Sequence, residues 1–514
     1  MAVTGIALAV APAAAECKAG ANGCSPTLTS KRALPIWSVP LIGPSAETNR
    51  IVVEGHGRGR DFQPTVARVP EPASNEPPPS LAIDQPLLPG FSSKLFGHEE
   101  RASFEVEANR LIFRCRPGDA PAGLVFSGRL SQGADLKILI ASSGMPGAMA
   151  GLSSPDREPH ELQSLNAGVT ELRPGEAAKE NGFALTLLCP LQGGEMIIDD
   201  MRLKAANPTR KVDARAAWAW NAALWREKPE FLLARAAELQ VGRLFVSLEI
   251  DAEKGVLDAE RFAGFVEKAH SAGIAIVVVE GDAGMALERG RQLALVRLAA
   301  IRRYQLDAEP TARIDGLQYD IEPYLLPDFL TDPEMVMRGW ADTIRALRTA
   351  TALDLEMVLP FWLRSDAHAR SHVLPALQQA ASGIAIMAYR TDRQQIVEAA
   401  SPLLAWAGEA GLRTRVALEN GPLEDEVTQT FFRAEKGKLT IETSADGRMH
   451  ATLLDRPAPS GKATFAFSHE TVSPASAVSF LGQADRFLES AGRTQEALKA
   501  WPAFSGMALH GIIE

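Results

Sequence analysis

The chain has 514 residues, a length typical of about three domains. Hydrophobic residues make up 46% of it and charged residues 23%, as in ordinary folded proteins. The formal net charge of -10 argues against nucleic acid as a partner, because phosphate binding needs a basic surface. No apolar run after the first residues approaches the roughly 20 residues of a membrane span, so none is expected.

The amino terminus has the pattern of an export signal. A short apolar run over residues 3–12 is followed by small residues that resemble a cleavage site, Ala13-Ala14-Ala15. We therefore expect residues 1–15 to be the remnant of a signal peptide, and the protein to be exported to the periplasm or beyond. The alternative is an alanine-rich start without fixed structure.

Four cysteines give the next constraint, because an even count in an exported protein allows disulfides. Cys17 and Cys24 would close a small loop. Cys115 and Cys189 lie in apolar stretches and could either form a bridge or simply be buried. Their spacing does not match a structural zinc site.

Two segments precede the main part of the chain. Residues 16–90 are rich in Pro, Gly and Ser, which predicts an extended arm or linker with at most two short strands. Residues 91–206 contain six candidate strands separated by turn residues, which predicts a β-sandwich. Its last strand, 196–203, resembles the end of carbohydrate-binding jelly-roll modules. The segment has no Trp or Tyr, so a purely structural sandwich is equally open.

From residue 207 to residue 514 strands and helices alternate. Eight alternating strands favour a closed parallel (β/α)8 barrel, the TIM barrel, over a doubly wound sheet. Residues 421–470 interrupt the alternation with hairpin-like segments and are predicted to be an insertion. The expected barrel strands are 216–220, 243–250, 274–280, 314–324, 353–362, 383–389, 415–419 and 506–510.

The fourth of these strands carries the most informative residues. Residues two apart on a strand share a face, so Gln318, Asp320 and Glu322 should point one way. Pro323 cannot donate to a sheet ladder and should end the strand. Two neighbouring acids at a strand exit are costly to bury unless they are paired or used in chemistry.

The carboxyl ends of the strands form the active face of such a barrel. Nearly every expected strand brings a polar or aromatic side chain there. Acids crowded on one rim disfavour joint ionisation, so one carboxyl group should stay protonated near neutral pH, as an acid catalyst for glycoside hydrolysis requires. Aromatic rings in the same place suit the apolar faces of sugar rings. The candidates beside Asp320 and Glu322 are Trp218, Trp220, Glu249, Glu280, Gln318, Tyr324, Trp362, Tyr389, Arg390, Glu419, Asn420 and His510.

The segment from Asp315 to Glu322, Asp-Gly-Leu-Gln-Tyr-Asp-Ile-Glu, resembles the strand-four signature of the family 18 glycoside hydrolases, the chitinase group. Met-Ala-Tyr at 387–389 resembles that family's strand-six motif, and the insertion is also similar. The resemblance implies that Glu322 protonates the leaving oxygen, with Asp320 and Tyr389 orienting the substrate's acetamido group. Three positions depart from the family pattern: Gln318 for Asp, Arg390 for Asp and His510 for Trp.

Three alternatives remain open. Glu322 and Glu419, on strands four and seven, could be the acid/base and nucleophile of a retaining glycosidase. The barrel could instead bind sugar without cleaving it. In a third interpretation, a divalent metal is bound by acids at the rim together with His510. No ligand spacing in the sequence is diagnostic of such a site, so neither a metal nor another cofactor is expected. The expected partner is a polysaccharide or oligosaccharide substrate.

Overall fold

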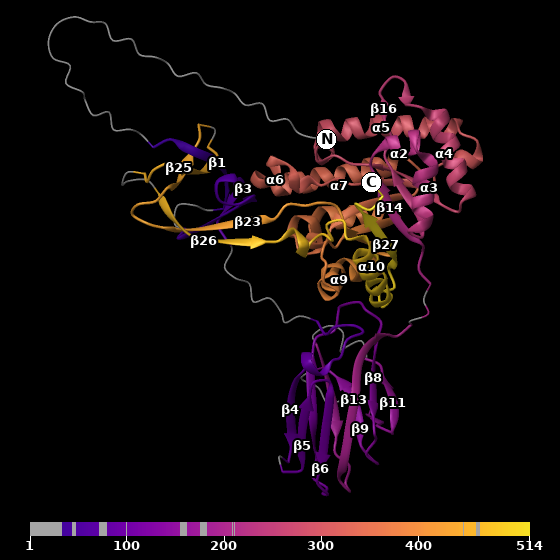
Figure 1. Ribbon diagram of the computed structural model, residues 1–514, viewed down its shortest axis with the longest axis vertical. Helices are drawn as coiled ribbons and strands as arrows, with labels where there is room; N and C mark the ends of the chain where they lie inside the picture. The colour runs from indigo at the N-terminus through magenta and orange to yellow at the C-terminus, as the bar shows by residue number, and fades with distance from the viewer. Residues whose placement is uncertain are drawn as a thin grey trace, which may run out of the picture.

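The computed structural model describes residues 33–43, 48–70, 80–98, 100–154, 162–174, 182–207, 209, 211–445, 447–458 and 463–513. The expected signal remnant, Cys17 and Cys24 lie outside these residues. A large α/β barrel forms the centre, with a small β-barrel to one side and two β-sheets at the far end (Figure 1). Within the described ranges, every helix is too short or too polar to cross a bilayer.

The expected eight-stranded parallel barrel is present and closed, because the first strand pairs with the last. Neighbours in sequence are neighbours in the barrel, as short right-handed crossovers produce. The strands in barrel order are β14 (Arg215–Ala219), β15 (Val241–Val246), β18 (Ala275–Glu280), β19 (Gly316–Tyr319), β20 (Leu355–Pro360), β21 (Gly383–Met387), β22 (Arg413–Glu419) and β27 (Phe504–His510).

Helices connect the strands and cover the barrel's outside. Their apolar faces pack on the outward side chains of the strands, in one continuous core that includes Leu317 and Tyr319 of β19. A short hairpin, β16 (Ile250–Asp251) and β17 (Gly255–Val256), interrupts the second crossover. The helices are α2 (Ala222–Glu227), α3 (Pro229–Glu238), α4 (Ala259–Ser271), α5 (Glu288–Asp307), α6 (Pro327–Thr331), α7 (Pro333–Ala350), α8 (Leu374–Ala380), α9 (Arg393–Ala410) and α10 (Ala484–Leu498).

The barrel's interior is a second, separate core. Large and small side chains from alternate strand positions fill it together, among them Phe245, Val277 and Ala385. Below them lies a polar group that is mostly buried, in which the Glu356 carboxyl accepts hydrogen bonds from Arg243 at 3.1 Å and from Gln318 at 3.4 Å. The partly buried rings packed against this core, Trp220, Tyr324 and Tyr389, lie near the carboxyl ends of the strands, the end of the barrel called the mouth below.

Residues 91–206 form more strands than the six predicted. They build two five-stranded antiparallel sheets, and part of segment 80–90 packs against them. One sheet has the order β10-β9-β12-β7-β4 and the other β11-β8-β13-β6-β5. The strands are β4 (Ser92–Gly97), β5 (Ala102–Glu107), β6 (Arg110–Cys115), β7 (Ala122–Gly128), β8 (Leu136–Ser142), β9 (Met149–Ser153), β10 (Leu162–Ser164), β11 (Gly168–Leu172), β12 (Phe183–Leu188) and β13 (Gly194–Ala205).

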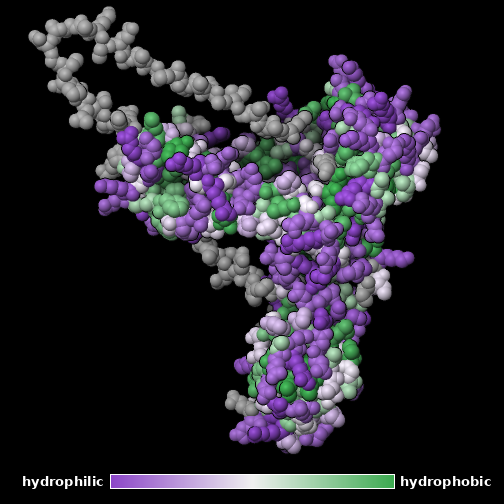
Figure 2. All heavy atoms as spheres, viewed as in Figure 1, coloured by the Kyte–Doolittle hydropathy of each residue, from purple (hydrophilic) through white to green (hydrophobic). Residues whose placement is uncertain are grey.

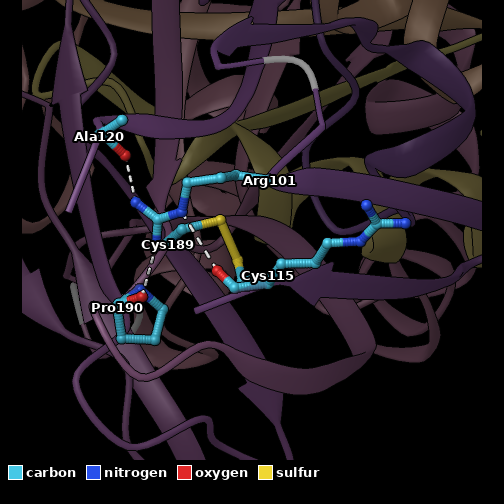
Figure 3. Close-up of a disulfide and its surroundings, with 6 residues drawn as sticks. Arg101, Cys115, Ala120, Cys189 and Pro190 are labelled. Carbon is cyan, nitrogen blue, oxygen red and sulfur yellow. Dashed lines mark hydrogen bonds between the residues drawn. A yellow bond between two sulfur atoms is a disulfide. The ribbon is translucent and has the colours of Figure 1, made fainter. Parts of the chain in front are cut away.

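A disulfide joins these two sheets, so the first of the two possibilities for this cysteine pair is the observed one. It links Cys115 at the end of β6 to Cys189 just after β12 (Figure 3). Beside it, the buried guanidinium of Arg101 donates to the carbonyl oxygen of Pro190 at 2.9 Å and also to that of Ala120. Arg101 thereby satisfies backbone acceptors that the turn would otherwise leave buried and unpaired.

The segment expected to be an arm is more ordered than predicted, and it pairs with the insertion. The strands β1 (Pro35–Ile42), β2 (Arg50–His56) and β3 (Gln63–Arg68) close a small barrel with β23 (Glu426–Arg433), β24 (Leu439–Thr443), β25 (Met449–Leu454) and β26 (Thr464–Ser473). Its core is apolar, and Figure 2 shows further hydrophobic areas on its surface. Strand pairs such as β1 with β25 join segments about 400 residues apart, which local patterns cannot reveal.

Candidate active site

Strand β19 places the two central acids just beyond its carboxyl end. Gln318 points into the barrel and is fully buried, while Leu317 and Tyr319 face the outer core. The strand ends at Tyr319, earlier than predicted, so Asp320 and Glu322 lie in the loop before a 3-10 turn, Pro323–Leu325. Because the two residues lie beyond the end of the strand, their side chains do not have to alternate between its faces, and both carboxyl groups can lie at the mouth.

Asp320, one of the acids at the mouth, has a buried oxygen without a partner in the described part of the chain and a raised pKa. Its Oδ1 is buried and has no hydrogen-bond partner among the described residues. Burial, and after it the neighbouring carboxylate of Glu322, raise the pKa of Asp320, while the nearby His510 lowers it; together they bring the pKa to about 7. Asp320 can therefore gain or lose a proton near neutral pH, and its orphan oxygen can accept a bond from a ligand.

Glu322 has one close partner. The hydroxyl of Tyr324, two residues along the chain, donates a hydrogen bond to Glu322 Oε1. Burial and the Glu322 carboxylate raise the pKa of Tyr324, which keeps the hydroxyl protonated as a donor. The Tyr324 ring meets Trp362 edge to face, with centroids 5.3 Å apart, so an aromatic pair supports the acid.

On the other side of the mouth, Glu419 and His510 form a pair. His510 Nδ1 lies 2.6 Å from Glu419 Oε2, and His510 Nε2 lies 3.2 Å from the indole nitrogen of Trp220. The second oxygen of Glu419 accepts from the backbone N–H of Gly421 at 2.5 Å. Burial raises the pKa of Glu419, but the bonds from His510 and the backbone outweigh it, and the pKa is lowered.

Aromatic rings connect these two sides. The Tyr389 ring is stacked on His510 with centroids 6.3 Å apart, and Trp218 meets His510 edge to face at 5.7 Å. Trp218 also donates from its indole nitrogen to Gln318 at 2.7 Å, which fixes the ring above the lumen. Trp220, Tyr324 and Tyr389 all pack on the top of the interior core. The mouth is thus lined by rings and carboxyl groups together.

Four other predicted site residues have different surroundings. Glu280 is buried in a two-bond pair with Arg297, at 2.5 and 2.9 Å, and Glu249 pairs with Arg226 at 2.8 Å. The Arg390 guanidinium lies over the Phe361 ring and donates to the Tyr389 carbonyl oxygen. Asn420 is buried and donates to the carbonyl oxygen of Gly511 at 3.2 Å.

Two glycines matter to the site and were not predicted. Gly511 has a φ of +66°, and a Cβ there would lie 2.8 Å from Glu419 Oε1. A Cβ on Gly421 would lie 2.9 Å from the same oxygen. Both positions therefore need glycine for the backbone to enclose the Glu419 carboxylate. A glycine directly after Asn420 and another directly after His510 were the available signals in the sequence.

A metal site does not emerge from the geometry. In the part of the chain that the structure describes, no three His, Cys, Asp or Glu side chains gather closely enough to bind an ion. Of the residues considered for that reading, Glu249 and Glu280 are engaged with arginines and His510 with Glu419.

Comparison with known proteins gives similarity of structure alone. No protein-family model and no curated protein matches the sequence. Similar solved structures are glycoside hydrolases, including chitinases. The class V chitinase of Nicotiana tobaccum is 12% identical, with 59% of this chain and 94% of that chain covered and a TM-score of 0.31. The spore cortex-lytic enzyme SleL of Bacillus cereus is 10% identical, over 58% and 72%, with a TM-score of 0.30.

A ruminal family 26 endo-β-1,4-mannanase is 8% identical, over 60% of this chain and 81% of that chain, with a TM-score of 0.27. At these identities and TM-scores the similarities do not bear on which reaction the chain performs. The function of the chain has to be inferred from the residues at the barrel mouth.

Proposed function

We propose that the protein is a glycoside hydrolase that cleaves a polysaccharide at the mouth of the large barrel. The observation that carries the proposal is the pair Asp320 and Glu322, set side by side beyond β19 and surrounded by aromatic rings. Buried acids are costly unless they are paired or used, and Asp320 has a buried oxygen without a hydrogen-bond partner among the described residues.

In this proposal Glu322 is the acid that protonates the bridging oxygen of the scissile bond. Tyr324, which donates to one oxygen of Glu322, leaves the other to face the substrate. Asp320 accepts a hydrogen bond from an N–H or O–H of the sugar at its orphan oxygen. An acetamido group at the cleavage point would fit this role, because its N–H would be held while its carbonyl oxygen attacks the anomeric carbon. Tyr389 would support that group from the neighbouring strand β21.

The second candidate is a barrel that binds sugar without cleaving it, and Gln318 favours it. Where the chitinase-like motif has an acid, this chain has an amide whose oxygen accepts from Trp218 and whose nitrogen donates to Glu356. Such a side chain cannot exchange a proton with Asp320. The third candidate, Glu419 as nucleophile, is disfavoured because hydrogen bonds engage both of its oxygens.

The experiment is hydrolysis by the wild type, Glu322→Gln and Glu409→Gln on a panel of polysaccharides, followed by reducing ends and mass spectrometry. Glu409 is an exposed acid of α9 and serves as the matched control. We expect Glu322→Gln to lose activity by about 10²–10⁴-fold, the usual contribution of an acid catalyst. Retained activity would refute the acid role, and binding without cleavage by the wild type would favour the second candidate.

We also propose that the protein is exported, and that the two sheets act as a β-sandwich that binds carbohydrate or braces the barrel. A disulfide between Cys115 and Cys189 suits an oxidising compartment. Export is tested by fractionating cells that express the full chain. Carbohydrate binding by the sheets is tested by retention of the protein on insoluble glycans after Glu322→Gln has removed cleavage.

A further inference from the structure

A polar cavity lies between the large barrel and the segment that precedes the two sheets. Its volume is about 580 Å³, within the range of about 300–1,000 Å³ that is typical of ligand pockets. Its walls include Asp84 of that segment, Arg393 at the start of α9, and Phe480 and Arg486 before and within α10. Both helices lie on the side of the barrel that faces the sheets (Figure 1). This α9–α10 cavity is therefore bounded by both parts of the chain.

The acids that line the α9–α10 cavity are already engaged. Asp84 pairs with Lys204 at 2.5 Å, and Glu489 pairs with Arg493 at 2.7 Å. Asp392 caps α9, because its side chain accepts a hydrogen bond at 2.9 Å from a backbone N–H of the first turn. Each of these carboxylates thus has a partner of its own, and none of them is the counter-ion of the other arginines in the cavity.

Two arginines of the cavity have unused hydrogen-bond donors. Arg393 Nη2 donates to the carbonyl oxygen of Ile83 at 3.1 Å, and the Arg486 guanidinium lies over the Phe480 ring, 5.7 Å from its centroid. Among the residues that the structure describes, no carboxylate lies within ion-pair distance of either guanidinium. Because a guanidinium has five N–H donors in a planar fork that matches a carboxylate, both arginines can bind an anion.

The cavity shares a wall with the mouth of the large barrel. The backbone N–H of Phe480 donates to the carbonyl oxygen of Glu419 at 3.0 Å. Thr391, two residues after Tyr389, donates from its hydroxyl to the carbonyl oxygen of Ser476 at 2.8 Å. The loops that carry Glu419 and Tyr389 therefore continue from the mouth into the wall of the cavity, and a chain-like ligand bound at the mouth can extend into it.

The mouth and the cavity differ in charge. Asp320, Glu322 and Glu419 place carboxyl groups at the mouth, where an anionic group on a sugar would be repelled. The cavity instead offers the two arginine side chains, together with the amide of Gln85 and the hydroxyl of Ser490, which suit sugar hydroxyls. A glycan whose acidic units are separated by uncharged ones would satisfy both places.

We propose that the α9–α10 cavity is a binding subsite for a uronic acid or another anionic sugar unit, with Arg393 and Arg486 holding its charged group. The glycan would be an acidic polysaccharide in which an uncharged unit lies at the mouth while a charged one lies in the cavity. Anion binding is argued from the cavity itself, and only the identification of the ligand as a glycan rests on the proposed function.

The test measures binding by calorimetry with the full chain carrying Glu322→Gln, which allows binding without cleavage. The probes are oligosaccharides in which uronic acids alternate with acetamido sugars, uncharged oligosaccharides of the same acetamido sugar, and inorganic phosphate. We expect the acidic oligosaccharide to bind about tenfold more tightly than either other probe. Adding Arg486→Gln should remove this advantage, whereas Arg302→Gln, a change of an exposed arginine on α5, should leave binding unchanged.

Equal binding of the acidic and the uncharged oligosaccharides would overturn the inference, as would an acidic preference that survives Arg486→Gln. Phosphate that binds as tightly as the acidic oligosaccharide would also overturn it, because the cavity would then be a site for free anions. The outcome for the proposed function is separate. Cleavage of uncharged glycans alone, without binding that depends on Arg486, would refute only the subsite. Binding that depends on Arg486, without cleavage of any glycan by the wild type, would support the subsite and refute the hydrolase.

Discussion

Replacing Asp320 by Asn should stabilise the protein above neutral pH while it impairs the site. Burial and the neighbouring Glu322 carboxylate raise the pKa of Asp320 from its ordinary value of 3.8 to about 7. A raised pKa means that the folded state binds more protons than the unfolded state between those two values, so stability falls as pH rises through that window. The loss is complete above the folded-state pKa.

The size of the effect follows from the shift. A shift from 3.8 to about 7 corresponds to about 4 kcal/mol, at about 1.4 kcal/mol for each pKa unit. Asn has the same shape and no charge, so Asp320→Asn removes the pH-dependent part. Below about pH 4 the difference in free energy of unfolding between variant and wild type should not depend on pH. Between about pH 4 and pH 8 the wild type should lose up to about 4 kcal/mol of stability relative to the variant.

Urea unfolding at a series of pH values measures this difference. Tryptophan fluorescence reports on the large barrel, because seven of the eight Trp residues follow residue 207. The exposed control Glu409→Gln should show a much smaller change with pH than Asp320→Asn. A difference for Asp320→Asn that stays constant from pH 4 to pH 8 would refute the inference that Asp320 is desolvated and unpaired.

Three further predictions test other contacts. Tyr324→Phe removes the hydroxyl that donates to Glu322 and should lower kcat about tenfold and shift the pH profile, while equal profiles for variant and wild type would exclude the contact from catalysis. The double variant Cys115→Ser, Cys189→Ser should destabilise the two sheets by about 4 kcal/mol, the loop-closure value for a separation of 74 residues. Urea unfolding should show a lower midpoint, and an unchanged midpoint would show that the disulfide does not stabilise the sheets. Gly511→Ala should strain a positive φ and crowd Glu419, which lowers the thermal stability, whereas Gly408→Ala, in open space on α9, should not lower it.

The large barrel could be predicted because its signals are local. Each strand is a short apolar run, and helices separate the strands, so element order alone favoured a closed parallel sheet. For the same reason the predicted start of the seventh strand, residue 415, lies close to Arg413, where β22 begins. The insertion was predicted to end at residue 470, but β26 continues to Ser473 and α10 begins at Ala484.

The site could be predicted only as a set of candidates. Alternation correctly placed Gln318 and Leu317 on opposite faces of β19, but Asp320 and Glu322 lie beyond the end of that strand, where alternation no longer applies. The alternation of residues could not show which of the acids would be paired with a basic side chain. Glu280 meets an arginine from α5, and Glu419 meets a histidine 91 residues away. Such pairings depend on tertiary packing, as do the small barrel's strand pairs, and leave no local pattern.

The most direct test of the central claim is a crystal structure of the Glu322→Gln protein with an oligosaccharide that the wild type cleaves. We predict that the sugar lies across the rings of the large barrel's mouth. The bridging oxygen of the scissile bond should be within hydrogen-bond distance of the side chain at position 322, and a sugar N–H or O–H should donate to Asp320. An oligosaccharide bound elsewhere, with Asp320 and Glu322 untouched, would contradict the account.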